Sequence, residues 1–195
     1  MKRLLLALVL AIVASTPALA HLNPAEHGSF AAGFSHPLFG TDHILAMTGV
    51  GLWAALLGGR ALWLVPTAFV VTMMAGFGLA MAHAGLPFVE PLIAASVVLL
   101  GLLALVALRA PTPIAMALAG FFALFHGYAH GGELGEAAAW PFMAGFALAT
   151  AALHAVGAGA GLGFSMSTRT QTGRWIARSL GGFSALGGLW IMSGG

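Results

Sequence analysis

Long apolar stretches with almost no charged residues constrain this chain more than any other feature of its sequence. Of its 195 residues, 60% are hydrophobic and only 6% are charged, whereas about a quarter of the residues in an ordinary soluble domain carry charge. An apolar stretch of about 20 residues can cross a lipid bilayer as a helix. The composition therefore predicts an all-α, polytopic membrane protein and excludes an ordinary soluble domain.

The apolar stretches are separated by short segments that contain glycine, proline or arginine. After a polar lead at residues 21–35, six stretches of spanning length are expected at Pro37–Leu57, Leu62–His83, Phe88–Leu108, Pro113–His130, Ala138 to the small-residue tract Gly157–Gly161, and Trp175–Met192. Residues 21–195 should thus form a single six-helix transmembrane domain. Small residues at four-residue spacing in the fifth stretch, and glycine pairs in the sixth, predict helices that approach closely.

Residues 1–20 have the three parts of a secretory signal peptide. Lys2 and Arg3 form the charged start, Leu4–Val13 is the apolar part, and Ala18–Ala20 matches an A-x-A cleavage site. The apolar part is shorter than a membrane span, although an uncleaved first anchor is the alternative. Cleavage would leave His21 as the new N-terminus, on the outer side of the membrane.

The charged residues give an independent test of six spans. If the mature N-terminus lies outside, the loops that carry Arg60, Arg109, Arg169 and Arg174 all fall in the cytoplasm. This is the distribution that the positive-inside rule requires. The acidic residues fall on the other side: Glu26, Glu90, Glu133 and Glu136. We therefore expect six spans with both the N- and C-termini outside.

Polar side chains gather at the outer ends of these predicted spans. Ionisable groups inside a membrane cost at least about 2.5 kcal/mol each, so they usually mark a pathway or a site. The group holds five histidines and three carboxylates: His36, Asp42, His43, His83, Glu90, His126, His130 and Glu133. His126 and His130 are four residues apart and share one helix face, and Gly131 and Gly132 should end that helix. Convergence at one membrane face predicts a divalent metal site.

The ligand types restrict the metal. The chain has no cysteine, which excludes thiolate sites and disulfides. Neutral imidazole suits nickel, cobalt, copper and zinc, and carboxylates neutralise charge. A site rich in histidine with one or two carboxylates fits Ni(II) or Co(II) best.

Some of these residues have ordinary structural alternatives. His83 and Glu90 are included from their position alone, and Glu90 could instead stabilise the first turn of a helix. His36 and Asp42 could form a structural hydrogen-bonded pair. His154 lies about 24 Å into the fifth span, far from the outer site, where it could be an exit-side relay or a packed polar residue. His21 could chelate metal through its ring and its free amine after cleavage.

Two motifs within this polar group resemble those of a known family. The stretch from His36 to His43 is similar to the HX5DH signature of the HupE/UreJ family of nickel permeases, and Phe125–Glu133 is similar to that family's FHGxAHGxE signature. The resemblance covers the whole chain and implies import of Ni(II), in some members Co(II), across the bacterial inner membrane to supply hydrogenase or urease. Metal-site roles carry over to six residues: His36, Asp42, His43, His126, His130 and Glu133.

We therefore expect a permease that passes its metal substrate inward and holds no permanent cofactor, rather than an enzyme. No nucleotide-binding motif is present, so uptake would not be driven by ATP on this chain. No basic run suggests nucleic acid, and cytoplasmic nickel metallochaperones are the expected partners. Two other functions remain open: an intramembrane metal-dependent hydrolase with Glu133 as base, and a haem-binding membrane protein with His83 and His130 as paired ligands.

Overall fold

The computed structural model describes residues 30–131, 139–167 and 171–193, and every regular element in these ranges is a helix. This confirms the all-α prediction for the described residues. The predicted signal peptide, most of the polar lead and residues 132–138, which include Glu133, lie outside them. The helices are α2 (Phe30–Phe39), α3 (Thr41–Leu57), α4 (Ala61–Met81), α5 (Val89–Val106), α6 (Thr112–Gly131), α7 (Ala139–Ser167) and α8 (Gln171–Met192).

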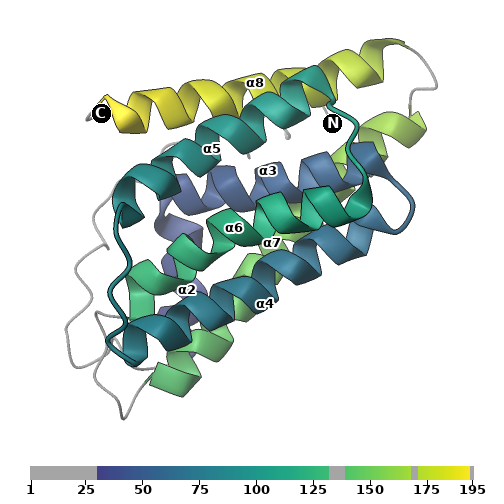
Figure 1. Cartoon of the computed structure of the whole chain (residues 1–195). Helices are drawn as coiled ribbons and strands as arrows, with labels where there is room; N and C mark the ends of the chain where they lie inside the picture. Colours follow the sequence, from purple (N-terminus) through teal and green to yellow (C-terminus); the bar gives the residue numbers. More distant parts are fainter. Residues whose placement is uncertain (1–29, 132–138, 168–170, 194–195) are drawn as a thin grey trace.

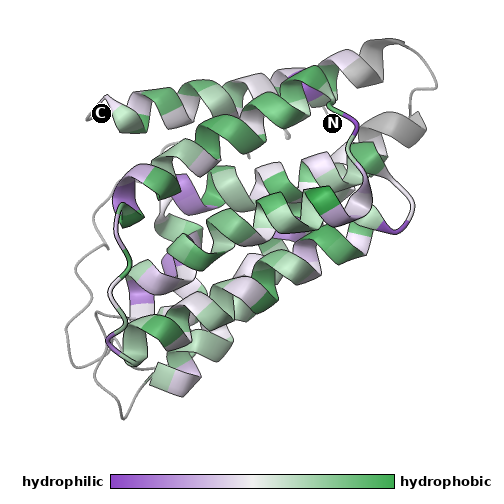
Figure 2. Cartoon of the chain, in the orientation of Figure 1, coloured by the Kyte–Doolittle hydropathy of each residue, from purple (hydrophilic) through white to green (hydrophobic). Residues whose placement is uncertain are grey.

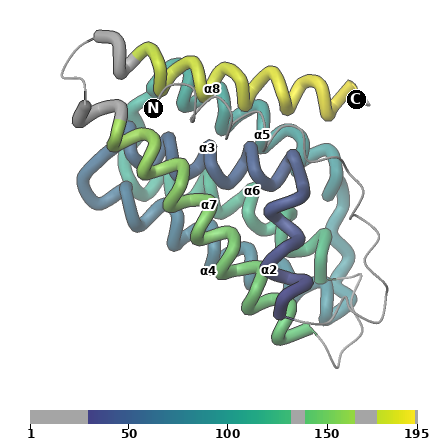
Figure 3. The backbone as a smooth tube through the Cα atoms, turned by 180° about the vertical axis from the view of Figure 1, so that it is seen from behind, coloured from purple at the N-terminus to yellow at the C-terminus, as the bar shows by residue number. Residues whose placement is uncertain are grey.

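The helices pack in pairs around α3 (Figure 1): α4–α6 and α3–α7 run parallel, whereas α5–α8 runs antiparallel. The most extensive contacts join α4 to α6, α5 to α8, and α3 to α7. Helix α3 lies in the middle of the bundle and also contacts α2, α4, α5 and α8. The view from behind shows the short α2 lying against α7, at the end of the bundle where α4 and α6 finish (Figure 3).

The outer surface of the bundle is apolar, and several polar side chains are inside. Trp140 is 74% exposed and Phe183 is 70% exposed, whereas His126 is fully buried. Figure 2 shows this apolar character along the helices, with hydrophilic residues mainly near their ends. Four helices are long and apolar enough to cross a membrane: α4, α5, α6 and residues Ala139–Gly163 of α7. Within the described residues α8 is not among them, and α3 is a shorter apolar helix of 17 residues.

The first predicted span differs from the structure. Instead of one helix that begins at Pro37, the helix begins at Phe30, and Pro37 lies inside α2. Gly40 then takes an extended conformation (φ −82°, ψ 114°) and separates α2 from α3. Proline lacks the amide hydrogen that a helix interior uses, and glycine breaks a helix at low cost. As a consequence, His36 and His43 lie on two separate helices.

Close helix approach depends on glycines, as the small-residue pattern predicts. A Cβ added to Gly157 of α7 would overlap the Thr48 carbonyl of α3, and one on Gly181 of α8 would clash with the α5 backbone. The α4–α6 pair is equally tight, although we did not predict it from the sequence. There a Cβ on Gly76 would overlap the Leu124 carbonyl. Such backbone-to-backbone contacts are typical of helices that associate in lipid.

This packing predicts different effects for two glycines of α4. Gly76→Ala should lower the midpoint of thermal unfolding in detergent, because the new methyl group meets the α6 backbone. Gly78→Ala is the matched control, since nothing lies within 4 Å of its Cβ position and alanine favours a helix. Equal midpoints for the two variants would contradict the close α4–α6 contact.

Candidate metal centre

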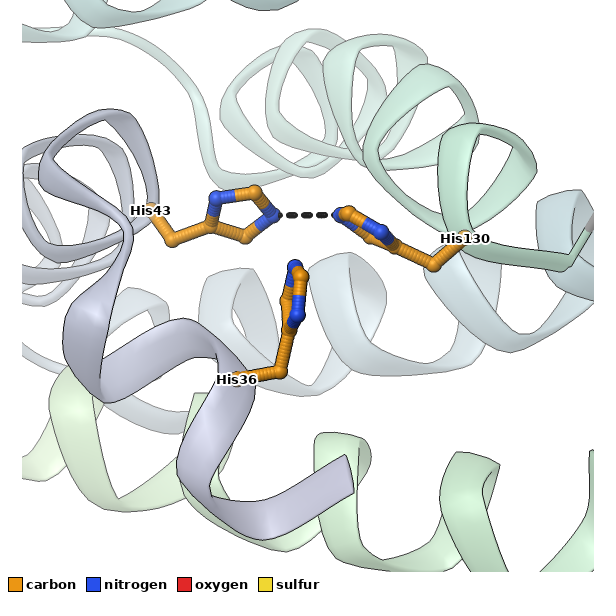
Figure 4. A group of neighbouring side chains, drawn as sticks. All are labelled: His36, His43 and His130. Carbon is orange, nitrogen blue, oxygen red and sulfur yellow. Dashed lines mark hydrogen bonds between the residues drawn. The ribbon is translucent and has the colours of Figure 1, made fainter. Parts of the chain in front are cut away.

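Three histidines from three helices converge at one point in the bundle (Figure 4). His36 comes from α2, His43 from the first turn of α3 and His130 from the last turn of α6. One ring nitrogen from each lies within 4.8 Å of the others. His43 is buried, and His130 is only 8% exposed. Among the described residues, this is the group of three or more potential ligands that could hold a metal ion; we call it the histidine triad.

The closest pair in the triad has the spacing of two ligands on one metal. The Nε2 atoms of His43 and His130 are 2.8 Å apart. Two imidazole nitrogens at right angles around a metal, each about 2.0–2.1 Å from it, would be about 2.9 Å apart. Without a metal, the same spacing makes an N–H···N hydrogen bond in which one ring donates. The ring of His36 packs edge-on against that of His130, with centroids 4.3 Å apart, and can supply a third nitrogen.

Asp42 lies behind His43 rather than beside the converging nitrogens. Its Oδ1 atom is 2.9 Å from Nδ1 of His43, on the side of the ring away from His130. A carboxylate in this position fixes the orientation of an imidazole and raises its basicity as a ligand. The sequence suggested that Asp42 could pair with His36, but the structure places it against His43.

The break at Gly40 makes room for this arrangement. A Cβ at residue 40 would lie 2.9 Å from Nδ1 of His43 and 3.0 Å from Oδ1 of Asp42. Both distances are shorter than ordinary van der Waals contact, so a side chain here would displace the pair. Gly40 therefore turns the chain and also gives the Asp42–His43 contact its space.

His126 lies one helical turn before His130 and is held by a different partner. Its Nε2 atom is 2.9 Å from the hydroxyl of Ser96 on α5. That hydroxyl also lies 2.6 Å from the Ile93 carbonyl, to which it donates its one hydrogen. The hydroxyl must then accept from Nε2–H of His126, which leaves the lone pair on Nδ1. The rings of His126 and His43 are 5.3 Å apart, so His126 is the next imidazole beyond the triad.

Phenylalanines of α7 enclose the triad. Phe146 is fully buried, and its ring centroid lies 5.0 Å from that of His130 and 5.7 Å from that of His43. Sequence reasoning missed Phe146 and Ser96. Nothing in the sequence distinguishes Phe146 among 13 phenylalanines. Ser96, in contrast, is a polar residue within the apolar third stretch, and this could have marked it as a candidate partner.

The remaining predicted residues lie elsewhere. His83 and Glu90 are exposed, and neither joins a group of potential ligands among the described residues. His154 is buried farther along α7. Glu133 and His21 lie outside the described residues, so their predicted roles stay predictions.

These observations define a multi-pass helical membrane protein with a buried histidine site suited to a divalent transition metal. The family model described as "HupE / UreJ protein" matches residues 8–191. A curated protein, Protein HupE of Rhizobium leguminosarum bv. viciae, is 43% identical over 180 residues, which cover 91% of this chain and 92% of that protein. The chain belongs to the HupE/UreJ family, a transporter-type family associated with nickel and cobalt uptake for hydrogenase and urease. No solved structure matches it.

The geometry predicts which histidines matter for metal binding. Purified His130→Ala protein should bind Co(II) at least ten times more weakly than the wild type, because it loses one of the two closest nitrogens. His83→Ala should bind like the wild type, since His83 is exposed and outside the triad. Isothermal titration, supported by the visible absorption of bound Co(II), measures both. Equal affinities for the wild type and His130→Ala would exclude the triad as the binding site.

Proposed function

We propose that this protein is a permease of the bacterial inner membrane that imports Ni(II) into the cytoplasm. Co(II) is a second substrate of the same site, and the metal serves enzymes such as hydrogenase or urease. The observation that carries this proposal is the convergence of three imidazoles from α2, α3 and α6 inside an apolar bundle. The family's association with nickel and cobalt uptake supports the choice of metal.

The proposed topology has six spans, a cleaved signal peptide at residues 1–20, and both mature ends outside. In this topology α2 and α3 cross the membrane together, and α8 forms the sixth span. Arg60 follows the end of α3 and Arg109 follows the end of α5, which places these ends in the cytoplasm. The triad lies at the other end of α3 and therefore toward the periplasm. Arg178 is consistent with this: its Nε donates to the Leu105 carbonyl at 2.6 Å, near the cytoplasmic end of α5.

Capture begins when a hydrated cation reaches the triad from the periplasm. His43 and His130 offer their Nε2 atoms and His36 a third nitrogen, which replace part of the water shell. The carboxylate of Asp42 orients His43 and offsets part of the cation's charge. The predicted ligand Glu133, two residues beyond the end of α6, would add a second carboxylate.

The membrane potential can drive the metal inward without ATP. An inside-negative potential contributes about 2.3 kcal/mol per charge per 100 mV, and a divalent cation experiences this twice. The protein needs only to replace the hydration shell along the path. Cytoplasmic nickel metallochaperones would then receive the metal.

The haem-binding alternative finds no support in the geometry. It required His83 and His130 to face each other at matched depth. His83 is exposed just beyond the end of α4, whereas His130 is buried.

Nickel accumulation in cells tests the proposal. Cells that express the wild type should accumulate radioactive nickel above empty-vector cells, and excess cobalt should compete more strongly than zinc. His130→Ala, at the same membrane level, should fall to the empty-vector value because the triad loses a ligand. His83→Ala is the control and should keep wild-type uptake.

Two results would contradict parts of this proposal. Wild-type cells that accumulate no more nickel and no more cobalt than empty-vector cells would refute the permease. Uptake that persists in His130→Ala would leave a permease but remove the triad from its pathway.

A further inference from the structure

Beyond the triad and His126, one more histidine lies deep in the bundle, and it has no hydrogen-bonding partner among the described residues. His154 of α7 is 2% exposed, and both of its ring nitrogens are buried with no hydrogen bond to the described residues. Buried polar groups are nearly always paired, because an unpaired one loses its hydrogen bonds to water without replacement. A histidine used only for packing would therefore be a poor choice here. Either tautomer of this ring leaves a lone pair available for a metal.

A row of side chains on α7 connects the triad to His154. Phe146, Thr150 and His154 recur every fourth residue and so share one face of the helix. Phe146 packs against the triad, and Thr150 donates to Sδ of Met73 at 3.6 Å. His154 packs edge-on against Phe69, with ring centroids 4.9 Å apart. Since α-helices rise about 1.5 Å per residue, His154 lies about 12 Å beyond Phe146 along α7.

His126 and Phe69 bridge the same interval from the other helices. The His126 ring is 5.3 Å from that of His43 in the triad and 5.8 Å from that of Phe69. Phe69 of α4 therefore lies between His126 and His154. A continuous series of buried rings runs from the triad inward, and its two inner imidazoles each keep an unpartnered nitrogen among the described residues.

An open groove lies at the inner end of this series, with Trp63, Val71 and Ala155 of its wall exposed. It has a volume of about 380 Å³, lies between α4 and α7, and is lined by His154 together with Leu62, Trp63, Pro66, Thr67 and Ala155 among others. The wall is mostly apolar. His154 is its one imidazole, and its ring nitrogens are covered in this conformation. With Arg60 in the cytoplasm, this first half of α4 belongs to the cytoplasmic half of the membrane.

We propose that His154 is a second, inner metal-binding position, which receives Ni(II) or Co(II) from the triad by way of His126. This inference rests on the proposed function. A single imidazole binds a divalent cation more weakly than three, so the inner position suits transfer rather than storage. The metal gives His154 the partner that it lacks among the described side chains.

Transport by purified protein in liposomes, with a nickel-sensitive dye inside, separates the two positions. His154→Leu should reduce the maximal uptake rate at least tenfold, because the metal has no inner ligand. Nickel binding at the triad, measured by titration, should stay within twofold of the wild type. Thr67→Val is the control: it removes a different polar group from the wall of the groove, and it should transport at the wild-type rate.

A cysteine variant provides a readout that does not depend on transport. Because the chain has no native cysteine, His154→Cys would introduce the one thiolate. Loading with Co(II) should then produce sulfur-to-cobalt charge-transfer absorption in the near ultraviolet. Ala155→Cys, next along α7 and in the wall of the groove, should show no such band. This measurement decides the question if His154→Leu does not fold.

Each result distinguishes the inner position from the proposed function. No nickel uptake by the wild type would refute the permease itself. Uptake by the wild type and by folded His154→Leu at equal rates would overturn the inner position alone. So would a folded His154→Cys protein that binds Co(II) without a thiolate band.

Discussion

The contact between His43 and His130 is the interaction on which the rest of the arrangement depends. Their Nε2 atoms lie 2.8 Å apart and join the central helix α3 to the end of α6. In an apolar bundle an imidazole nitrogen needs a partner, and here each ring supplies one for the other. A metal in the same place would replace this single hydrogen bond with bonds to both nitrogens.

Close packing of the helices allows this contact. Glycines at the α4–α6 and α3–α7 crossings let backbones touch. The start of α3 and the end of α6 therefore lie close together, without long side chains between them. The break at Gly40 then folds α2 back over α7, so that His36 approaches from a third direction. Aromatic residues of α7 fill the space around the three rings. A dry environment of this kind strengthens electrostatic interactions between a cation and its ligands.

Much of this arrangement could be predicted from residue type and spacing. Apolar stretches predicted α4, α5 and α6 to within two residues at every end, because a helix that crosses a membrane extends as far as its apolar residues do. Four-residue spacing predicted that His126 and His130 share a face, and both are buried in α6. Their different partners were not predictable: Ser96 is distant in sequence, and its contact with His126 depends on how α5 packs beside α6.

The first helix shows the limit of such reasoning. Pro37 suggested a helix start. The helix instead begins upstream at Phe30, and the chain breaks at Gly40, three residues after Pro37. Local preference allowed both positions, and the packing of α2 against α7 decided between them. His83 and Glu90 show a second limit, since a shared membrane face does not place side chains at one point. Both are exposed, whereas the triad is enclosed.

The most direct test of the account is the X-ray absorption spectrum of nickel bound to the purified protein. The triad predicts first-shell nitrogen and oxygen atoms at about 2.0–2.1 Å, with the outer-shell scattering that rigid imidazole rings produce. Fitting should require at least two, and with His36 three, imidazoles per metal. A spectrum that fits oxygen ligands alone, without imidazole scattering, would contradict the central claim that His36, His43 and His130 bind the metal together.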